Sequence, residues 1–280
     1  MGDPEPLQAD EVRQQTLSPA LLLCVGPRTA FIVLCGCITL LLGGYVMTVA
    51  VRLLTPHQWQ FGLAGLFDLN AEANVPTYFS VIQLAIVAVL LVVIGWHART
   101  RADRFARHWL VLGAIFLFLS LDELAQIHEQ WNLLRDALHT TGMLYYAWVL
   151  PYGLLTAAVG VFYIGFLLHL PARTRWLFVL SGLIYVGGAV GLEMYGGYLE
   201  SHIGREAIAT SLPYLTEVFF EEGMEMFGIA LFIYALLAHM QAEIGRVAIN
   251  IGPARGSAGA SPPKDLSTAE TLRILQDGTK

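Results

Sequence analysis

Six long apolar segments, separated by short polar links, dominate this chain. Each is about 20 residues long or longer, which is the length that an α-helix needs to cross about 30 Å of hydrocarbon. The pattern predicts an all-α, polytopic integral membrane helix bundle with six transmembrane helices. The predicted spans cover approximately residues 29–54, 76–96, 108–128, 144–169, 175–198 and 212–239.

The composition agrees with this pattern. Of the 280 residues, 56% are hydrophobic and only 14% are charged, which is typical of a polytopic membrane protein and unusual for a soluble domain. We expect a cytoplasmic N-terminal segment over residues 1–27, a transmembrane domain over residues 28–240 and a cytoplasmic tail over residues 241–280. The tail is rich in Gly, Ser, Ala and Pro, so we expect it to be disordered.

Arginines gather in alternate links between the spans. The link between the second and third spans is rich in arginine, and the link after the fourth span contains Arg173 and Arg175. The intervening links contain few, among them Arg135 and Arg205. Because Lys and Arg favour cytoplasmic loops, we expect both termini in the cytoplasm (N-in/C-in) of a multi-pass protein of the cell membrane, with the lipid bilayer as its partner.

Acidic side chains lie inside or at the edges of three apolar segments, and no Lys accompanies them. A carboxylate in hydrocarbon costs several kcal/mol unless it is protonated, paired or bound to a cation. In the predicted orientation, all three acidic groups lie in the extracytoplasmic half of the bilayer. The acids are Asp122, Glu123 and Glu129 in the third span, Glu193 in the fifth, and Glu217, Glu221, Glu222 and Glu225 in the sixth.

A bound divalent metal cation is the compensation that we favour, because several acids crowded in a low dielectric cannot all ionise without one. Carboxylates alone favour Mg, Ca, Mn or Fe, whereas a histidine ligand shifts the choice towards Zn or Fe. The sequence therefore predicts a cation-binding carboxylate cluster of undetermined metal. The predicted metal-site residues are Asp122, Glu123, His128, Glu193, Glu221, Glu222 and Glu225.

The place of His128 in this cluster is open. On an ideal helix, Asp122, Gln126 and Glu129 share one face, and His128 falls nearly opposite its centre. Either the third span ends or distorts before His128, or His128 faces a different neighbour.

Two structural interpretations compete with a metal site. Acids near the ends of transmembrane helices are often solvated in the headgroup region, and we expect this of Glu129, Glu200 and Glu217. The deeper acids could instead be protonated and hydrogen-bonded in a network that joins helices, with partners such as Tyr145 and Tyr146.

Two short patterns add to this picture. Asp122-Glu123 near a helix end and Glu221-x3-Glu225-x2-Gly228 on a later helix resemble the acidic pattern of small VanZ-like membrane proteins. That resemblance covers a short part of the chain, departs from the pattern at Glu225, where Asn is expected, and implies no function. Separately, Gly187-x3-Gly191 in the fifth span is a signal for close helix packing.

Three classes of function remain, and no motif of a soluble active site identifies catalytic residues. The first is a metal-dependent membrane enzyme that acts from the outer leaflet on a lipid-like or small-molecule substrate. The second is a cation- or proton-coupled transporter. The third is a noncatalytic membrane subunit or assembly factor whose acids pair with basic residues of a partner. The net charge of -6 gives no reason to expect a nucleic-acid partner.

The arginine pattern yields a prediction about orientation. Cysteine labelling or reporter fusions should place residue 103 on the cytoplasmic side and residue 205 on the opposite side. The reverse result at both positions would overturn the N-in/C-in topology, and with it the extracytoplasmic placement of the acids.

Overall fold

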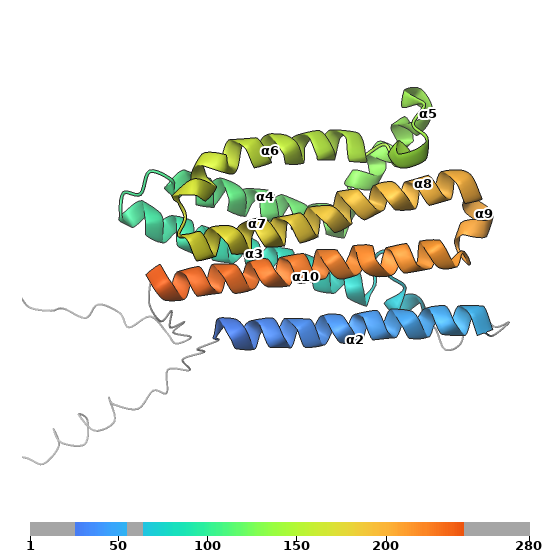
Figure 1. Ribbon diagram of the computed structural model, residues 1–280, viewed down its shortest axis with the longest axis horizontal. Coiled ribbons are helices and arrows are strands. Elements are labelled where there is room, and N and C mark those ends of the chain that lie inside the picture. The colour runs from blue at the N-terminus through green and yellow to red at the C-terminus, as the bar shows by residue number, and fades with distance from the viewer. Residues whose placement is uncertain (1–25, 55–63, 244–280) are drawn as a thin grey trace, which may run out of the picture. The chain divides into compact units, whose positions relative to one another are not determined.

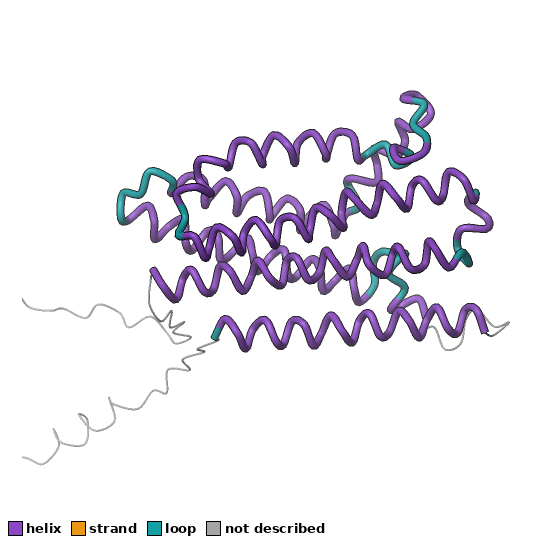
Figure 2. Tube along the Cα trace, viewed as in Figure 1, coloured by secondary structure: helices purple, strands orange, loops and turns teal. Residues whose placement is uncertain are grey.

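The computed structural model describes residues 26–54 and 64–243, and this part of the chain is an all-α helical bundle without strands, as predicted. Six helices are long and apolar enough to cross a membrane, so the chain is a multi-pass membrane protein. Figures 1 and 2 show how these helices are arranged. They are α2 (Pro27–Leu54), α3 (Val75–Thr100), α4 (Ala106–Ala125), α6 (Val149–His169), the continuous span Ala172–Ile203, and α10 (Leu212–Glu243).

The fifth span is not a uniform α-helix. It consists of α7 (Ala172–Val186), a π-helical turn η4 (Gly187–Leu192) and α8 (Glu193–Ile203). The turn has the sequence GGAVGL, and glycine favours the regular α-helix least among residues other than proline. Such π-helical turns are frequent at functional sites, and this one borders the cavity described below.

The shorter helices lie in links at one end of the bundle, which we call the loop-rich end. It carries the described residues 64–74 and links 126–148 and 204–211, and it lies at the right of Figure 1. The opposite end carries the short links 101–105 and 170–171. That the loop-rich end is extracytoplasmic remains a prediction. The shorter helices are η1 (Ala64–Phe67), η2 (His128–Leu134), α5 (Arg135–Leu138), η3 (Gly142–Leu144) and α9 (Arg205–Ile208).

Several predicted boundaries are wrong by a few residues. The third span ends at Ala125 rather than residue 128, because Gln126 adopts a left-handed backbone conformation with φ 53° and ends the helix. The fourth span begins at Val149 rather than residue 144, so Pro151 lies in its first turn, where a missing N–H costs no helical hydrogen bond. The predicted terminal segments, apart from residues 26–27 and 241–243, lie outside the described residues.

Helix α10 is the centre of the bundle. In its most apolar stretch 56% of the residues are buried, against 17–39% for the other five spans. Figure 1 shows α10 between α2 and the α7–α8 span. Two long-range hydrogen bonds tie neighbours to its backbone: the Tyr45 hydroxyl donates to the Leu215 carbonyl (3.1 Å), and the Gln83 amide donates to the Met226 carbonyl (3.4 Å). The helix that carries more of these acids than any other is therefore also the helix on which the others pack.

Glycines allow the fifth span to approach α10 closely. A Cβ added to Gly188 would lie 2.8 Å from the Glu221 carbonyl oxygen, and one added to Gly228 would lie 2.8 Å from the backbone nitrogen of Tyr185. A Cβ added to Gly191 meets no atom within 4 Å. In the predicted Gly187-x3-Gly191 pair, Gly191 therefore makes no close contact with a neighbouring helix. The close contact with α10 is made by Gly188 instead.

The two glycines form a matched test of this packing. We expect Gly188→Ala to lower stability by about 1–3 kcal/mol, because its methyl group would collide with backbone of α10. Gly191→Ala lies in the same π-helical turn and should be neutral or mildly stabilising, since alanine loses less backbone entropy. The melting temperatures of the two variants in detergent would check this. Equal melting temperatures would contradict the close approach of η4 to α10.

Candidate metal centre

A cavity of about 220 Å³ opens between the spans on the loop-rich side of the bundle. It brings together all seven residues that the sequence analysis named as metal-site candidates; their role as ligands remains a prediction. We call it the acidic cavity, because its lining includes Glu72, Asp122, Glu123, Glu129, Glu193, Glu221, Glu222 and Glu225, together with His128.

The charge balance of this cavity is one-sided. Among the described residues that line it, eight carry carboxylates and none is Lys or Arg. Carboxylates crowded in a low dielectric repel one another, so they must take up protons or bind a cation. The remaining polar lining is mainly tyrosine, tryptophan and amide side chains, which can donate hydrogen bonds but cannot neutralise the charge.

One wall of the cavity is the turn that precedes α3, and it presents Glu72. Asp68 in this turn forms an ion pair with Arg52 at the end of α2. Asn74 caps α3 by accepting a hydrogen bond from the Thr77 amide (3.1 Å), and its own amide donates to the Asp68 carbonyl (2.7 Å). These bonds hold both ends of the turn, and Glu72 lies between them with its side chain half-buried.

The opposite wall is formed by the end of α4, and it presents His128. The left-handed Gln126 reverses the chain, so His128 returns towards the helix that has just ended. Its Nδ1 lies 3.1 Å from Asp122 Oδ2, and the Tyr152 hydroxyl donates to Asp122 Oδ1 at 2.7 Å. Of the two alternatives left open by the sequence, the span therefore ends before His128.

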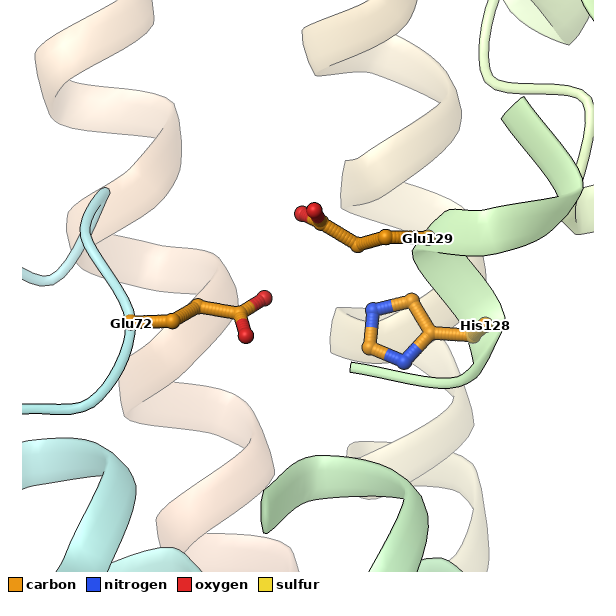
Figure 3. A group of neighbouring side chains, drawn as sticks. All are labelled: Glu72, His128 and Glu129. Atoms are coloured by element: carbon orange, nitrogen blue, oxygen red, sulfur yellow. The ribbon is translucent and has the colours of Figure 1, made fainter. Parts of the chain in front are cut away.

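This contact assigns different roles to Asp122 and His128. When Nδ1 carries the proton, it donates to the Asp122 carboxylate, and Nε2 is left with a free lone pair. Figure 3 shows one ring nitrogen of His128 facing the gap between the side chains of Glu72 and Glu129. A carboxylate that orients a metal-binding histidine in this way is a recurrent feature of metal sites. Asp122 is placed to orient a ligand, and both of its oxygens are already hydrogen-bonded.

Three residues come close enough to share one ion. Glu72, His128 and Glu129 each offer one ligand atom, and these atoms all lie within 4.8 Å of one another. We call this group the Glu72–His128–Glu129 group. Glu72 comes from the first link at the loop-rich end, whereas the other two come from the second link. The arrangement joins two links that are far apart in the sequence.

The electrostatics of the group follow from its burial and its charges. Burial, reinforced by the negative charge of Glu129, raises the pKa of Glu72 to about 7. Burial alone would lower the pKa of His128, but the hydrogen bond to Asp122 and the charges of Asp122, Glu123 and Glu72 outweigh it and raise that pKa. Oε2 of Glu72 accepts no hydrogen bond from the described donors. Around neutral pH the group therefore holds a proton where a cation could bind.

Five further carboxylates lie deeper between the spans. Glu193 begins α8 directly after the π-helical turn, and Trp148 Nε1 donates a hydrogen bond to its Oε1 at 3.2 Å. Glu222 and Glu225 of α10 both interact electrostatically with Glu123 of α4 and with Glu193. Glu221 completes the set on α10. These acids form a second layer below the Glu72–His128–Glu129 group.

Two expectations about the remaining acids are wrong. Glu200 is buried rather than solvated: it accepts hydrogen bonds from the hydroxyls of Tyr145 (3.0 Å) and Tyr146 (2.6 Å) and from Nε of Arg205 (3.2 Å). Glu217 is also buried, beside Gly196, and does not line the acidic cavity. Glu129 is exposed, as expected for an acid near a helix end, but it faces Glu72 and His128.

The sequence analysis missed Glu72. This residue lies in a link rather than in an apolar span, so a search for acids in hydrocarbon could not find it. A signal was present: the described part of this link contains Asp68 and Glu72 but no Lys or Arg, and it leads into the helix-capping residue Asn74.

Comparison with known proteins places the chain in a family. No curated protein and no solved structure matches it. Residues 26–240 match a family model described as a domain of unknown function, DUF8692. This range includes all six membrane-spanning helices, the last of them nearly to its end, and every residue that lines the acidic cavity. The match covers well over half of the chain, and the chain therefore belongs to the DUF8692 family.

Proposed function

We propose that this protein is a divalent-cation-dependent membrane enzyme, with the Glu72–His128–Glu129 group as its metal site. The observation that carries the proposal is the geometry of His128. One ring nitrogen is engaged by Asp122, and the other faces the carboxylates of the adjacent Glu129 and of Glu72, which comes from a different link. Hydrogen bonds from Tyr152 to Asp122 and between Asp122 and His128 thus hold the imidazole ring in place. The free ring nitrogen of His128 points towards the carboxylates of Glu72 and Glu129.

The donor set suggests the kind of metal. Two carboxylates and one imidazole suit Zn, Mn or Fe, and three protein ligands leave a coordination position open for water or substrate. A metal in such a site can lower the pKa of its bound water or polarise a bound carbonyl or phosphoryl oxygen. The reaction class that we propose is metal-assisted hydrolysis or group transfer on a substrate that enters the acidic cavity.

The second layer of acids would handle protons in such a reaction. Glu123, Glu222 and Glu225 all line the acidic cavity and are half-buried. A carboxylic acid can donate a proton to a leaving group, and a carboxylate can accept one from water. We therefore assign to this layer the role of general acid and base, with no single residue chosen.

A transporter is the second candidate, and the sequence of α10 argues against it. From Met226 to Met240 this central helix contains no Asp, Glu, Lys or Arg. The acids accordingly occupy one side of the bundle, and α10 offers no relay of charged groups to the other end. A one-sided site agrees better with an enzyme that takes its substrate from one face of the membrane.

The first prediction concerns metal binding. We expect that chelation lowers the melting temperature of the detergent-purified protein, and that adding back Zn²⁺ or Mn²⁺ restores it. Glu72→Gln and His128→Ala should remove this response, because each deletes a ligand. Asp122→Asn should weaken metal affinity about 10–100-fold, as is typical when the residue that orients a ligand is changed.

Thermal-shift titration with each ion, supported by elemental analysis, measures this response. Glu206→Gln is the control, since Glu206 is an exposed acid outside the acidic cavity. If chelation and a panel of divalent ions leave the melting temperature of the parent unchanged, the metal site does not exist, and a protonated network explains the acids better.

The second prediction separates chemistry from structure. Glu123→Gln, Glu222→Gln and Glu225→Gln should reach the membrane at near-normal levels, because an amide keeps the shape and removes like-charge repulsion. They should nevertheless fail to restore the phenotype of a deletion strain, since an amide neither binds a cation as a carboxylate does nor titrates.

The matched control is Glu217→Gln, a buried acid on the same helix that does not line the acidic cavity. We expect this variant to restore the phenotype. Full rescue by all three cavity variants would contradict a chemical role for the second layer. Loss of expression in those variants would favour a purely structural role for the acids.

A further inference from the structure

An apolar groove of about 210 Å³ lies between α4, α6, α7 and α10, farther from the loop-rich end than the acidic cavity. Its few hydroxyl groups are largely occupied. The Tyr163 hydroxyl donates to the His108 carbonyl at 2.9 Å, and the Ser181 hydroxyl donates to the Phe178 carbonyl at 3.0 Å. The groove therefore offers little to a polar ligand. Apart from these residues it is lined by Leu112, Phe116, Val159, Gly160, Phe166, Leu167, Gly182, Tyr185, Gly228, Ile229 and Phe232.

The groove and the acidic cavity are neighbours. Tyr185 lines both of them. On each of the four helices, the lining changes from cavity to groove within about one helical turn. The change runs from Leu119 to Phe116 on α4, from Thr156 to Val159 on α6, from Val186 to Gly182 on α7, and from Glu225 to Gly228 on α10.

The groove is open towards the outside of the bundle at two glycines. Gly160 of α6 and Gly182 of α7 line it at exposed positions, and a Cβ added to either would meet no atom within 4 Å. Along α7, the groove extends from Phe178 to Tyr185, which corresponds to about 10 Å of helix. This is a substantial part of one leaflet of a hydrocarbon core about 30 Å thick. The groove is thus long, apolar and parallel to the membrane-spanning helices.

We propose that the substrate is a membrane lipid with a phosphate headgroup, whose hydrocarbon chain lies in this groove while its headgroup occupies the acidic cavity. The inference rests on the proposed function, because the carboxylates would repel a phosphate unless a cation lies between them. Divalent ions bridge protein carboxylates and phosphate oxygens readily. The junction at Tyr185 then marks the boundary between chain and headgroup.

The groove contributes position rather than affinity. A lipid chain that moves from the bilayer into an apolar groove gains little, since both surroundings are hydrocarbon. The groove sets the depth and direction of the lipid's hydrocarbon chain, and these place the headgroup beside the Glu72–His128–Glu129 group. Orienting a reacting group in this way is itself a source of catalysis. An experiment on the groove must accordingly measure where a chain lies, and not only whether a lipid binds.

Photolabelling measures that position directly. The probe is hexadecyl phosphate with a diazirine in its chain, added to the full-length protein in phosphatidylcholine nanodiscs with Mn²⁺, and labelled peptides are identified by mass spectrometry. We expect labelling of groove residues on α6 and α7. Gly160→Leu should abolish it by filling the groove, and Gly182→Leu should do so from the opposite wall.

Gly165→Leu is the matched control. Gly165 lies on the same helix as Gly160, borders open space in the same way, and does not line the groove. This variant should be labelled as the parent is. The same probe with a hydroxyl in place of its phosphate should label the groove no more than it labels other lipid-facing helices. Melting temperatures of all variants establish that they are folded.

The outcomes separate this inference from the function on which it rests. Equal labelling of Gly160→Leu and Gly165→Leu, or equal labelling by the phosphate-free probe, would mean that only bulk lipid fills the groove and would overturn the inference. A metal response without any groove labelling would overturn it too, while leaving the metal site intact. Groove labelling that depends on Gly160 but persists after chelation would support the site for the hydrocarbon chain and overturn the cation bridge to the phosphate; the metal site itself stands or falls with the response of the melting temperature to divalent ions.

Discussion

The concentration of uncompensated carboxylates inside a hydrophobic bundle is the constraint on which the rest of this structure depends. Eight of them line one cavity, and none of the described residues around it is Lys or Arg. A soluble protein could leave such groups to water, but here apolar spans surround them. Every charge must be removed by a proton or matched by a cation. The central place of α10, which supplies three of these acids, ties that requirement to the core of the fold.

The acids of the bundle differ in how far their oxygens are hydrogen-bonded. Asp122 has a donor for each oxygen, and Glu200 accepts from two tyrosines and an arginine. Those two acids are fully engaged. Glu72 has one oxygen without a described donor, and its neighbour Glu129 can share a proton with it only when one of the pair is protonated. Both oxygens of the buried Glu217 also lack a described donor. What sets Glu72 apart is therefore its company, because ligand atoms of His128 and Glu129 lie within 4.8 Å of its own.

The sequence predicted the fold well because the strongest physical signal, the length and hydropathy of each span, is local. It also led to all seven residues that the structure gathers around one cavity, since an acid in an apolar segment is recognisable by itself. Three features escaped because they depend on contacts between distant parts of the chain. They are the left-handed Gln126 that returns His128 to Asp122, the π-helical turn before Glu193, and Glu72 in a link. The burial of Glu200 and Glu217 escaped for the same reason: position near a helix end says nothing about the tyrosines or glycines opposite.

The layered order of the bundle connects these observations. At the loop-rich end, two links bring Glu72, His128 and Glu129 together. Below them lie the acids of α4, α8 and α10, and below those the apolar groove. The polarity of the interior thus falls from one end towards the middle across two adjoining cavities, and Tyr185 lines both. A lipid has the same order, with a charged head, a polar junction and an apolar chain. This shared order over the same four helices is the reason for proposing an amphiphile as substrate in preference to a wholly polar metabolite.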